Sequence, residues 1–264
     1  MTTIDPLELL DIASVVAGEA GALAASMRRD GISVAATKSS QLDIVTQADT
    51  AVESLIRDRL AQARPGDGVL GEEAGKDDRD SEIVWIVDPI DGTVNYLYGS
   101  PNWAVSIAAT APGPGDTRIS VAAVVYAPEL GAEYTAAAGH PAHRNGATLR
   151  VNTQVPLDKA LVSTGFLYGL ASRARVVEDI ASLSPRIRDF RMSGSAALGI
   201  CGVADGSVDG YFQRGLPIWD YAAATLIAAR AGASVHGLDG GAPSSQLLLV
   251  AEGDLVDALQ PHLA

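Results

Sequence analysis

The chain has 264 residues, of which 47% are hydrophobic, and a formal net charge of −13 from 32 acidic and 19 basic side chains. Such a chain can bury a large core. Its acidity argues against a nucleic-acid partner, but not against a small phosphorylated substrate held with divalent cations. A single cysteine excludes an intrachain disulfide, the N-terminus lacks a signal-peptide pattern, and Glu19 interrupts the most apolar stretch. We therefore expect a cytoplasmic protein that is not embedded in a membrane.

The first half of the chain, about residues 1–150, has the pattern of an α+β unit. Asp5 and Pro6 suit the start of a helix that runs to about Arg29. Apolar residues at helical spacing predict a second helix from near Asp49 to before Pro65. Strands are expected at 83–87, 104–109 and 119–126, and a hairpin turn at 145–146, where Asn-Gly readily takes positive φ angles.

The second half, about residues 151–264, alternates between strand and helix patterns. Strands are expected near 161–164, 189–192 and 208–212, and helices near 173–183, 196–203 and 220–231. Such alternation is typical of an α/β unit. We expect the two halves to form a single domain over residues 1–264.

The most informative motif lies at Trp85–Thr93. Its apolar run ends in two carboxylates, Asp88 and Asp91, which are separated by Pro-Ile and followed by Gly-Thr. Pro89 and Gly92 are expected to stop the strand after residue 87 and to force a turn. This places both aspartates where the backbone leaves the sheet.

Four acidic residues stand at predicted element ends beside glycine, proline or tryptophan: Glu72, Asp88, Asp91 and Asp220. Taken singly, each is more often a turn former than a ligand. Together they form an oxygen-donor set for Mg²⁺, whose charge would offset the four carboxylates. A phosphate dianion then needs further donors, and the backbone N–H groups of Gly92 and Thr93 supply them if a short helix starts there.

These motifs resemble the inositol monophosphatase family of Mg²⁺-dependent, lithium-sensitive phosphomonoesterases. The resemblance rests on Gly71-Glu72-Glu73, on Asp88-Pro-Ile-Asp-Gly-Thr-Val-Asn95 and on Trp219-Asp220-Tyr-Ala-Ala-Ala, together with the segment from Lys38 to Asp49. It spans essentially the whole chain. It implies a layered αβαβα sandwich and a homodimer.

The resemblance also implies roles for individual residues. The ligands of two or three Mg²⁺ ions would be Glu72, Asp88, the carbonyl of Ile90, Asp91 and Asp220. Glu72 and Thr93 would orient the attacking water, and Asp49 would accept a hydrogen bond from the Thr93 hydroxyl. Lys38 and Asp43 would be supporting charges. Glu73 is a weaker candidate for direct chemistry.

Substrate contacts are expected from Asp91, Gly92, Thr93 and Asp220, from the run Gly194-Ser195-Ala196, and from Gln213. Typical members of the family carry a glutamate where this chain has Gln213. A glutamine still donates and accepts hydrogen bonds to a polyol but has no charge. Inositol 1-phosphate or a close polyol phosphate is therefore the leading substrate. Histidinol phosphate, fructose 1,6-bisphosphate and a 3′-phosphoadenosine nucleotide are the alternatives.

Two further alternatives are of a different kind. An aspartyl-phosphate phosphatase carries Asp-x-Asp-Gly-Thr after a strand, whereas this chain has Asp-x-x-Asp with Pro89 at the nucleophile's position. A non-catalytic interaction subunit of an RNA-bound complex is the other. The intact acidic set argues against lost catalysis. The four histidines lie outside these motifs, and Cys201 is expected to be a buried small residue.

Overall fold

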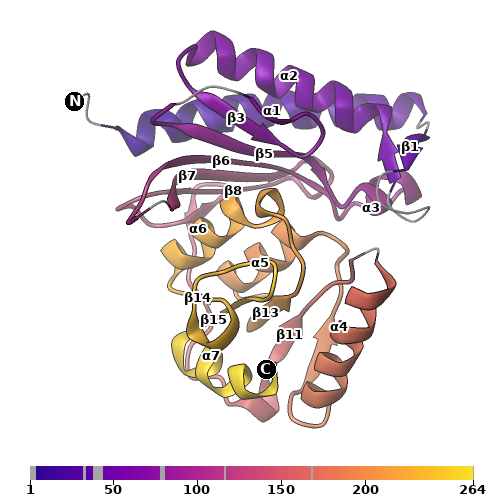
Figure 1. Ribbon diagram of the computed structural model, residues 1–264, viewed down its shortest axis with the longest axis vertical. Helices are drawn as coiled ribbons and strands as arrows, with labels where there is room; N and C mark the ends of the chain where they lie inside the picture. The colour runs from indigo at the N-terminus through magenta and orange to yellow at the C-terminus, as the bar shows by residue number, and fades with distance from the viewer. Residues whose placement is uncertain are drawn as a thin grey trace.

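The computed structural model describes residues 4–31, 34–37, 44–77, 81–115, 117–167 and 169–263. Figure 1 shows helices and sheets stacked in five alternating layers: a helical pair, a large sheet, a second helical pair, a smaller sheet and outer helices. This confirms the αβαβα arrangement expected from the sequence.

The α-helices are α1 (Pro6–Asp30), α2 (Gln47–Ala63), α3 (Thr93–Tyr98), α4 (Leu170–Leu183), α5 (Ala196–Ala204), α6 (Ala222–Ala231) and α7 (Gly253–Leu259). The strands are β1 (Val34–Thr37), β2 (Ile44–Thr46), β3 (Gly68–Gly71), β4 (Gly75–Lys76), β5 (Val84–Asp91), β6 (Ala104–Pro112), β7 (Arg118–Ala127), β8 (Ala132–Ala137), β9 (His143–Arg144), β10 (Ala147–Thr148), β11 (Leu161–Ser163), β12 (Asp189–Arg191), β13 (Gly210–Gln213), β14 (Ser234–His236) and β15 (Leu248–Ala251). Short 3₁₀ helices lie at Pro128–Leu130, Leu157–Lys159, Ile218–Asp220, Leu238–Gly240 and Gln260–His262.

The large sheet has the strand order β10-β9-β8-β7-β6-β5-β3-β4. Only β3 and β5 pair in parallel among these neighbours; the other pairs are antiparallel. Helices α1 and α2 cover one face of this sheet (Figure 1). Their small and aliphatic side chains pack on Trp85, Val87 and Ile107 in one continuous apolar cluster. This packing fixes α2 beside the ends of β3 and β5.

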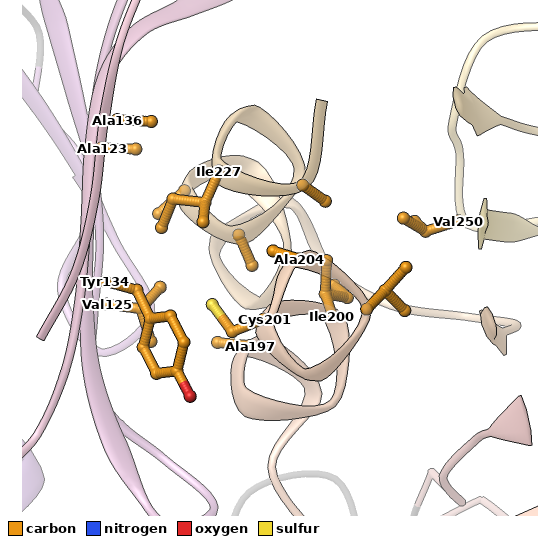
Figure 2. Close-up of a cluster of buried hydrophobic side chains, with 14 of the residues drawn as sticks. Ala123, Val125, Tyr134, Ala136, Ala197, Ile200, Cys201, Ala204, Ile227 and Val250 are labelled. Atoms are coloured by element: carbon orange, nitrogen blue, oxygen red, sulfur yellow. The ribbon is translucent and has the colours of Figure 1, made fainter. Parts of the chain in front are cut away.

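Helices α5 and α6 fill the space between the two sheets. Figure 2 shows Ala197, Ile200, Cys201 and Ile227 between the large sheet on one side and Val250 of β15 on the other. The small sheet has the order β12-β11-β13-β15-β14. Its far face packs against α7 and the end of α4 through a third apolar cluster. The middle layer therefore joins the two halves of the chain through a shared core.

Most of the predicted elements are confirmed. Helix α1 begins as expected: the Asp5 carboxylate accepts a hydrogen bond from the Leu7 N–H, and Pro6 occupies the first turn. The hairpin at residues 145–146 has positive φ at both positions. Cys201 is buried. Strands β1, β2, β3, β4, β8, β14 and β15 and helix α7 were not predicted.

One expectation about the central motif is wrong. The strand does not stop before Asp88, because β5 continues through Asp91. Its pairing with β6 is irregular between Asp88 and Asp91. Because Pro89 has no N–H group to donate, a central strand tolerates it only where the hydrogen bonding to the neighbouring strand is interrupted.

Helix α1 also bears on the membrane expectation. The helix is long enough to cross a membrane, and an 18-residue window of it has a mean hydropathy of 1.4 despite Glu19. Of that window, 44% is buried within the protein. Core helices of soluble proteins meet the same criterion. Here α1 lies against α2, β6 and β7.

Candidate active site

A cavity of about 120 Å³ lies where β3, β5, β11 and β13 end and α3 and α5 begin. Residues from both halves of the chain line it: Glu72, Asp88, Ile90, Asp91, Gly92, Thr93, Thr164, Gly165, Phe166, Leu167, Gly194, Ser195, Ala196, Gln213, Leu216 and Asp220. The structure thus brings the four predicted acidic residues to one cavity.

The pairing of strands explains how the acidic residues meet. Because β3 runs parallel to β5 with Gly71 opposite Val87, the next residues lie side by side at the same end of the two strands, Glu72 just after β3 and Asp88 within β5. On the other side of β5, Asp88 lies opposite Ser106 of β6. The Ser106 hydroxyl donates to the carbonyl of Trp219 at 3.4 Å, which holds the 3₁₀ turn carrying Asp220 against the sheet.

The irregularity in β5 shapes the ligand-bearing backbone. Asp88 Oδ1 accepts a hydrogen bond of 3.0 Å from the N–H of Ile90, two residues along. Pro89 and Ile90 lie in the segment where pairing with β6 is interrupted. A backbone carbonyl in such a segment is released from the regular ladder. Ile90 lines the cavity, so its carbonyl oxygen is a candidate cation ligand as well as an acceptor for the Thr93 hydroxyl.

The acidic side chains strongly perturb Asp88. Asp88 is 2% exposed. Burial raises its pKa well above the ordinary value, and the nearby charges of Glu72, Asp91, Asp220 and Asp49 raise it further. Each of these causes disfavours the ionised form of Asp88. A positive charge placed among these carboxylates would reverse the effect.

Asp91 is held by the start of α5. The Ser195 hydroxyl and the N–H of Ala197 (2.8 Å) donate to its Oδ2, and the N–H of Ala196 donates to its Oδ1 at 3.1 Å. Burial raises the pKa of Asp91 to about 6, although these hydrogen bonds oppose the rise. The Ala196 N–H, which the sequence suggested as a substrate donor, thus binds Asp91 in this structure.

Gly92 marks the close approach of the two halves. Its φ of +93° is left-handed, and a Cβ there would lie 3.0 Å from the Asn102 carbonyl and 3.2 Å from that of Gly194. Asn95, one turn into α3, bridges the same elements by donating to the carbonyls of Asn102 and Ser193, both at 2.7 Å. Sequence reasoning quoted Asn95 in the motif but gave it no role.

Thr93 and Asp49 form the contact that the family resemblance implied. The Thr93 hydroxyl lies 3.2 Å from Asp49 Oδ1 and 3.2 Å from the Ile90 carbonyl. Both neighbours are acceptors and the hydroxyl has one proton, so that proton is shared between them or donated to one, and the oxygen lone pairs remain available to a donor. Asp49 is 1% exposed and lies in the first turn of α2.

Neutral polar groups line the other side of the cavity. Gln213 is 5% exposed, and its Oε1 accepts a hydrogen bond of 2.6 Å from the Tyr211 hydroxyl. Gly165 allows this, because a Cβ there would overlap the Gln213 amide oxygen. The buried Thr164 hydroxyl, which sequence reasoning missed, has no hydrogen-bond partner among the residues that the structure describes. Strand pattern alone does not mark such a group.

The donor set fits a hard divalent cation. All its ligand atoms are oxygens, from four carboxylates and the Ile90 carbonyl, and Mg²⁺ prefers such atoms. Within the described ranges, no three acidic, histidine or cysteine side chains converge tightly enough to enclose an ion. A cation that entered the cavity would offset the repulsion among these carboxylates.

Lys38, Asp43 and Glu73 are the remaining sequence candidates. Lys38 and Asp43 fall outside the described residues. Glu73 is absent from the cavity lining, and so are the four histidines.

The sequence model of the inositol monophosphatase family matches residues 5–263. The chain belongs to the inositol monophosphatase family. This confirms the resemblance, and it means that the cavity lies in the fold of a phosphatase-type family.

Relatives and solved structures agree with the family. Inositol-1-monophosphatase SuhB of Mycobacterium tuberculosis strain H37Rv is 42% identical over 252 residues, covering 88% of this chain and 84% of that protein. Nus factor SuhB of Escherichia coli K12 is 37% identical over 235 residues, covering 88% and 86%. The crystal structure of extragenic suppressor protein SuhB from Bartonella henselae has a TM-score of 0.89 at 30% identity, covering 97% and 98%.

Proposed function

We propose that this inositol monophosphatase family member is a Mg²⁺-dependent phosphomonoesterase that hydrolyses myo-inositol 1-phosphate or a close polyol monophosphate. The observation that carries the proposal is the single cavity in which four carboxylates face a neutral polar wall. The carboxylates suit divalent cations, and the wall suits an uncharged alcohol.

The residues divide into three roles. Glu72, Asp88, Asp91, Asp220 and the Ile90 carbonyl would hold two or three Mg²⁺ ions. When bound, these ions would lower the pKa of a water molecule and offset charge on the phosphate oxygens. Glu72 and Thr93 would orient that water for in-line attack on phosphorus, with the Thr93 proton directed away by Asp49.

Substrate binding would use both halves of the lining. The backbone N–H groups of Gly92 and Thr93 would bind the phosphate. Asp91, Gly194–Ala196, Gln213 and Asp220 would contact the alcohol, and we add the Thr164 hydroxyl to this set. Thr164 is added because the residue lines the cavity and its buried hydroxyl has no partner in the described part of the chain, so a small rotation would let it hydrogen-bond to a polyol. Since the cavity draws on both halves, we treat residues 1–264 as one functional domain.

The test is phosphate release from a panel of esters. Inositol 1-phosphate, histidinol phosphate, fructose 1,6-bisphosphate and 3′-phosphoadenosine 5′-phosphate are compared with Mg²⁺, with chelator, and with Mg²⁺ plus Li⁺. We expect Mg²⁺-dependent release, fastest for the inositol ester and inhibited by Li⁺. No turnover of any ester with Mg²⁺, or a trapped phosphoaspartate, would refute the mechanism. Light scattering checks the proposed homodimer, and cell fractionation its cytoplasmic location.

A second candidate function follows from the 37% identity to a protein named as a Nus factor. We propose as this alternative that the chain is an interaction subunit of an RNA-bound complex. The discriminating variant is Asp88→Asn, which removes a proposed metal ligand and leaves the surface intact. If the Asp88→Asn variant restores the wild-type phenotype in a deletion strain, the interaction role accounts for the defect of that strain. If the variant does not restore it, the enzyme role is supported.

A further inference from the structure

Glu53 is a buried carboxylate on α2 that the proposed function does not use. It lies one helical turn after Asp49, and both residues are 1% exposed. Residues four apart on a helix lie on one face. That face of α2 therefore directs two buried carboxylates toward the ends of β3 and β5.

The Glu53 carboxylate binds the backbone just after Glu72. Its Oε2 accepts the N–H of Glu73 at 2.7 Å, and its Oε1 accepts the N–H of Ala74 at 3.0 Å. The same Oε1 accepts Arg57 Nε at 2.8 Å. Two consecutive backbone donors are thus fixed by one side chain from a different element.

The backbone just before Glu72 is held as closely. A Cβ on Gly71 would overlap the Glu53 carboxylate, so only glycine lets α2 approach β3 this closely. Glu53 therefore contacts the residue on each side of Glu72. Because Gly71 is also registered against Val87 of β5, the direction of Glu72 relative to Asp88 depends on this contact.

Arg57 balances the charge of Glu53 and forms a further hydrogen bond to the same turn. Its second nitrogen, Nη2, donates to the Gly75 carbonyl at 2.5 Å, so the turn from residue 71 to 75 is tied to α2 at several points. A buried ion pair is weak support for stability, because desolvation costs much of what the attraction provides. Precise placement of the turn is the better account of why the charge is buried here.

We propose that Glu53 is a positioning residue that acts through Glu72. Helix α2 then aligns both groups assigned to the attacking water: Asp49 holds Thr93, and Glu53 holds the turn that carries Glu72. The inference rests on the proposed function, since it gives Glu72 its role as metal ligand and water-orienting group.

The decisive variant is Glu53→Gln. One oxygen becomes an NH₂ group, which must face either the Glu73 N–H or the Ala74 N–H together with Arg57, so at least one donor loses its acceptor. Loss of such support for a metal ligand weakens metal affinity by about 10–100-fold. We expect the half-saturating Mg²⁺ concentration to rise by about that factor and kcat to fall by about 10–100-fold. The KM at saturating Mg²⁺ should change less than about threefold.

Asp58→Asn is the matched control, because Asp58 is exposed on the same helix and the change removes the same charge. Glu53→Asp is measured as well, since it keeps the charge but shortens the reach to the Glu73 and Ala74 N–H groups. Mg²⁺ binding is followed by calorimetry. Hydrogen exchange of the Glu73 and Ala74 amides reports directly on their hydrogen bonds to Glu53. Neither readout requires turnover. The two Glu53 variants should shift both, with Glu53→Asp intermediate, and Asp58→Asn should shift neither.

A double-mutant cycle with Glu72→Gln tests whether Glu53 acts through Glu72. If it does, Glu53→Gln weakens Mg²⁺ binding in the wild-type background but adds little in the Glu72→Gln background. Additive losses, or a lower Tm for Glu53→Gln with unchanged Mg²⁺ affinity, would overturn the proposal. If the wild type binds Mg²⁺ but hydrolyses no ester, the proposed reaction fails while the Mg²⁺ cycle still decides the role of Glu53. A wild type that binds no Mg²⁺ overturns both.

Discussion

Replacing Asp88 with asparagine should separate stability from activity in this protein. Asp88 is buried, and the nearby charges of Glu72, Asp91, Asp220 and Asp49 oppose its ionisation. Asparagine keeps the Oδ1 atom that accepts the Ile90 N–H, so local geometry is retained while the charge is removed. Without Mg²⁺, the variant should therefore be more stable than the wild type.

The size of the effect follows from the same contacts. Removing one buried, repelled charge should add on the order of 1–3 kcal/mol to the free energy of unfolding in chelator. At about 2–4 °C per kcal/mol for a chain of this size, the Tm rises by about 2–12 °C. With Mg²⁺ at a hundred times the wild-type Kd, the wild type gains about 2.7 kcal/mol. The variant, with its Kd raised to the Mg²⁺ concentration or beyond, gains no more than about 0.4 kcal/mol.

The assay is thermal unfolding of both proteins in chelator and in saturating Mg²⁺, with phosphate release measured alongside. The Tm order should reverse or the gap should close on adding Mg²⁺, and turnover of the variant should fall by orders of magnitude. A variant that is destabilised in chelator, or that keeps both its Mg²⁺ shift and its turnover, would refute the assignment of Asp88 as a ligand.

Three further predictions concern the same cavity. In chelator, the raised pKa of Asp91, about 6, means that the folded protein binds a proton more readily than the unfolded chain, so this group should cost stability as pH rises from 4 through 6, by up to about 3 kcal/mol. Urea unfolding should show a slope of this sign, and Asp91→Asn should reduce it, leaving the part that Asp88 contributes through its own raised pKa. Gly92→Ala should cost about 1–2 kcal/mol in backbone strain and also lower kcat, because its Cβ meets the Asn102 and Gly194 carbonyls. The control Gly146→Ala has a similar φ but open space around the Cβ, so it should lower stability alone. Equal kcat values for the two variants would contradict this prediction. Gln213→Glu should improve kcat/KM for histidinol phosphate relative to inositol 1-phosphate by about tenfold, since a charged hydrogen bond exceeds a neutral one by about 1–2 kcal/mol. An unchanged ratio would mean that the alcohol of the substrate does not contact residue 213.

Local signals in the sequence were sufficient for the long elements. Asp5 and Pro6 start α1, and Asn145-Gly146 makes a tight hairpin. These features depend on the conformational preferences of a few adjacent residues. The family motifs likewise identified acidic residues that the fold brings together, because Glu72, Asp88 and Asp91 lie at the same end of the neighbouring strands β3 and β5.

Long-range contacts were beyond the reach of sequence reasoning. Ser195 and Ala196 were expected to contact the substrate, but their hydrogen bonds to Asp91, more than a hundred residues away, could not be anticipated. Glu53 reads as an ordinary helical acid until β3 is seen to pass beside it. The Thr164 hydroxyl becomes notable only when burial shows that it lacks a partner among the described residues.

The continuation of β5 illustrates a different limit. Pro89 argued for an early end to the strand, as proline cannot donate to a ladder. The strand continues because its pairing with β6 is interrupted at that point, an accommodation that requires knowledge of the partner strand.

The most direct test of the central claim is the rate of phosphate release from myo-inositol 1-phosphate by the purified protein, measured with Mg²⁺ and again with chelator. The arrangement of Glu72, Asp88, Asp91 and Asp220 predicts turnover that requires Mg²⁺ and returns when Mg²⁺ is restored. Turnover that persists in chelator, or its absence at saturating Mg²⁺, would contradict the account.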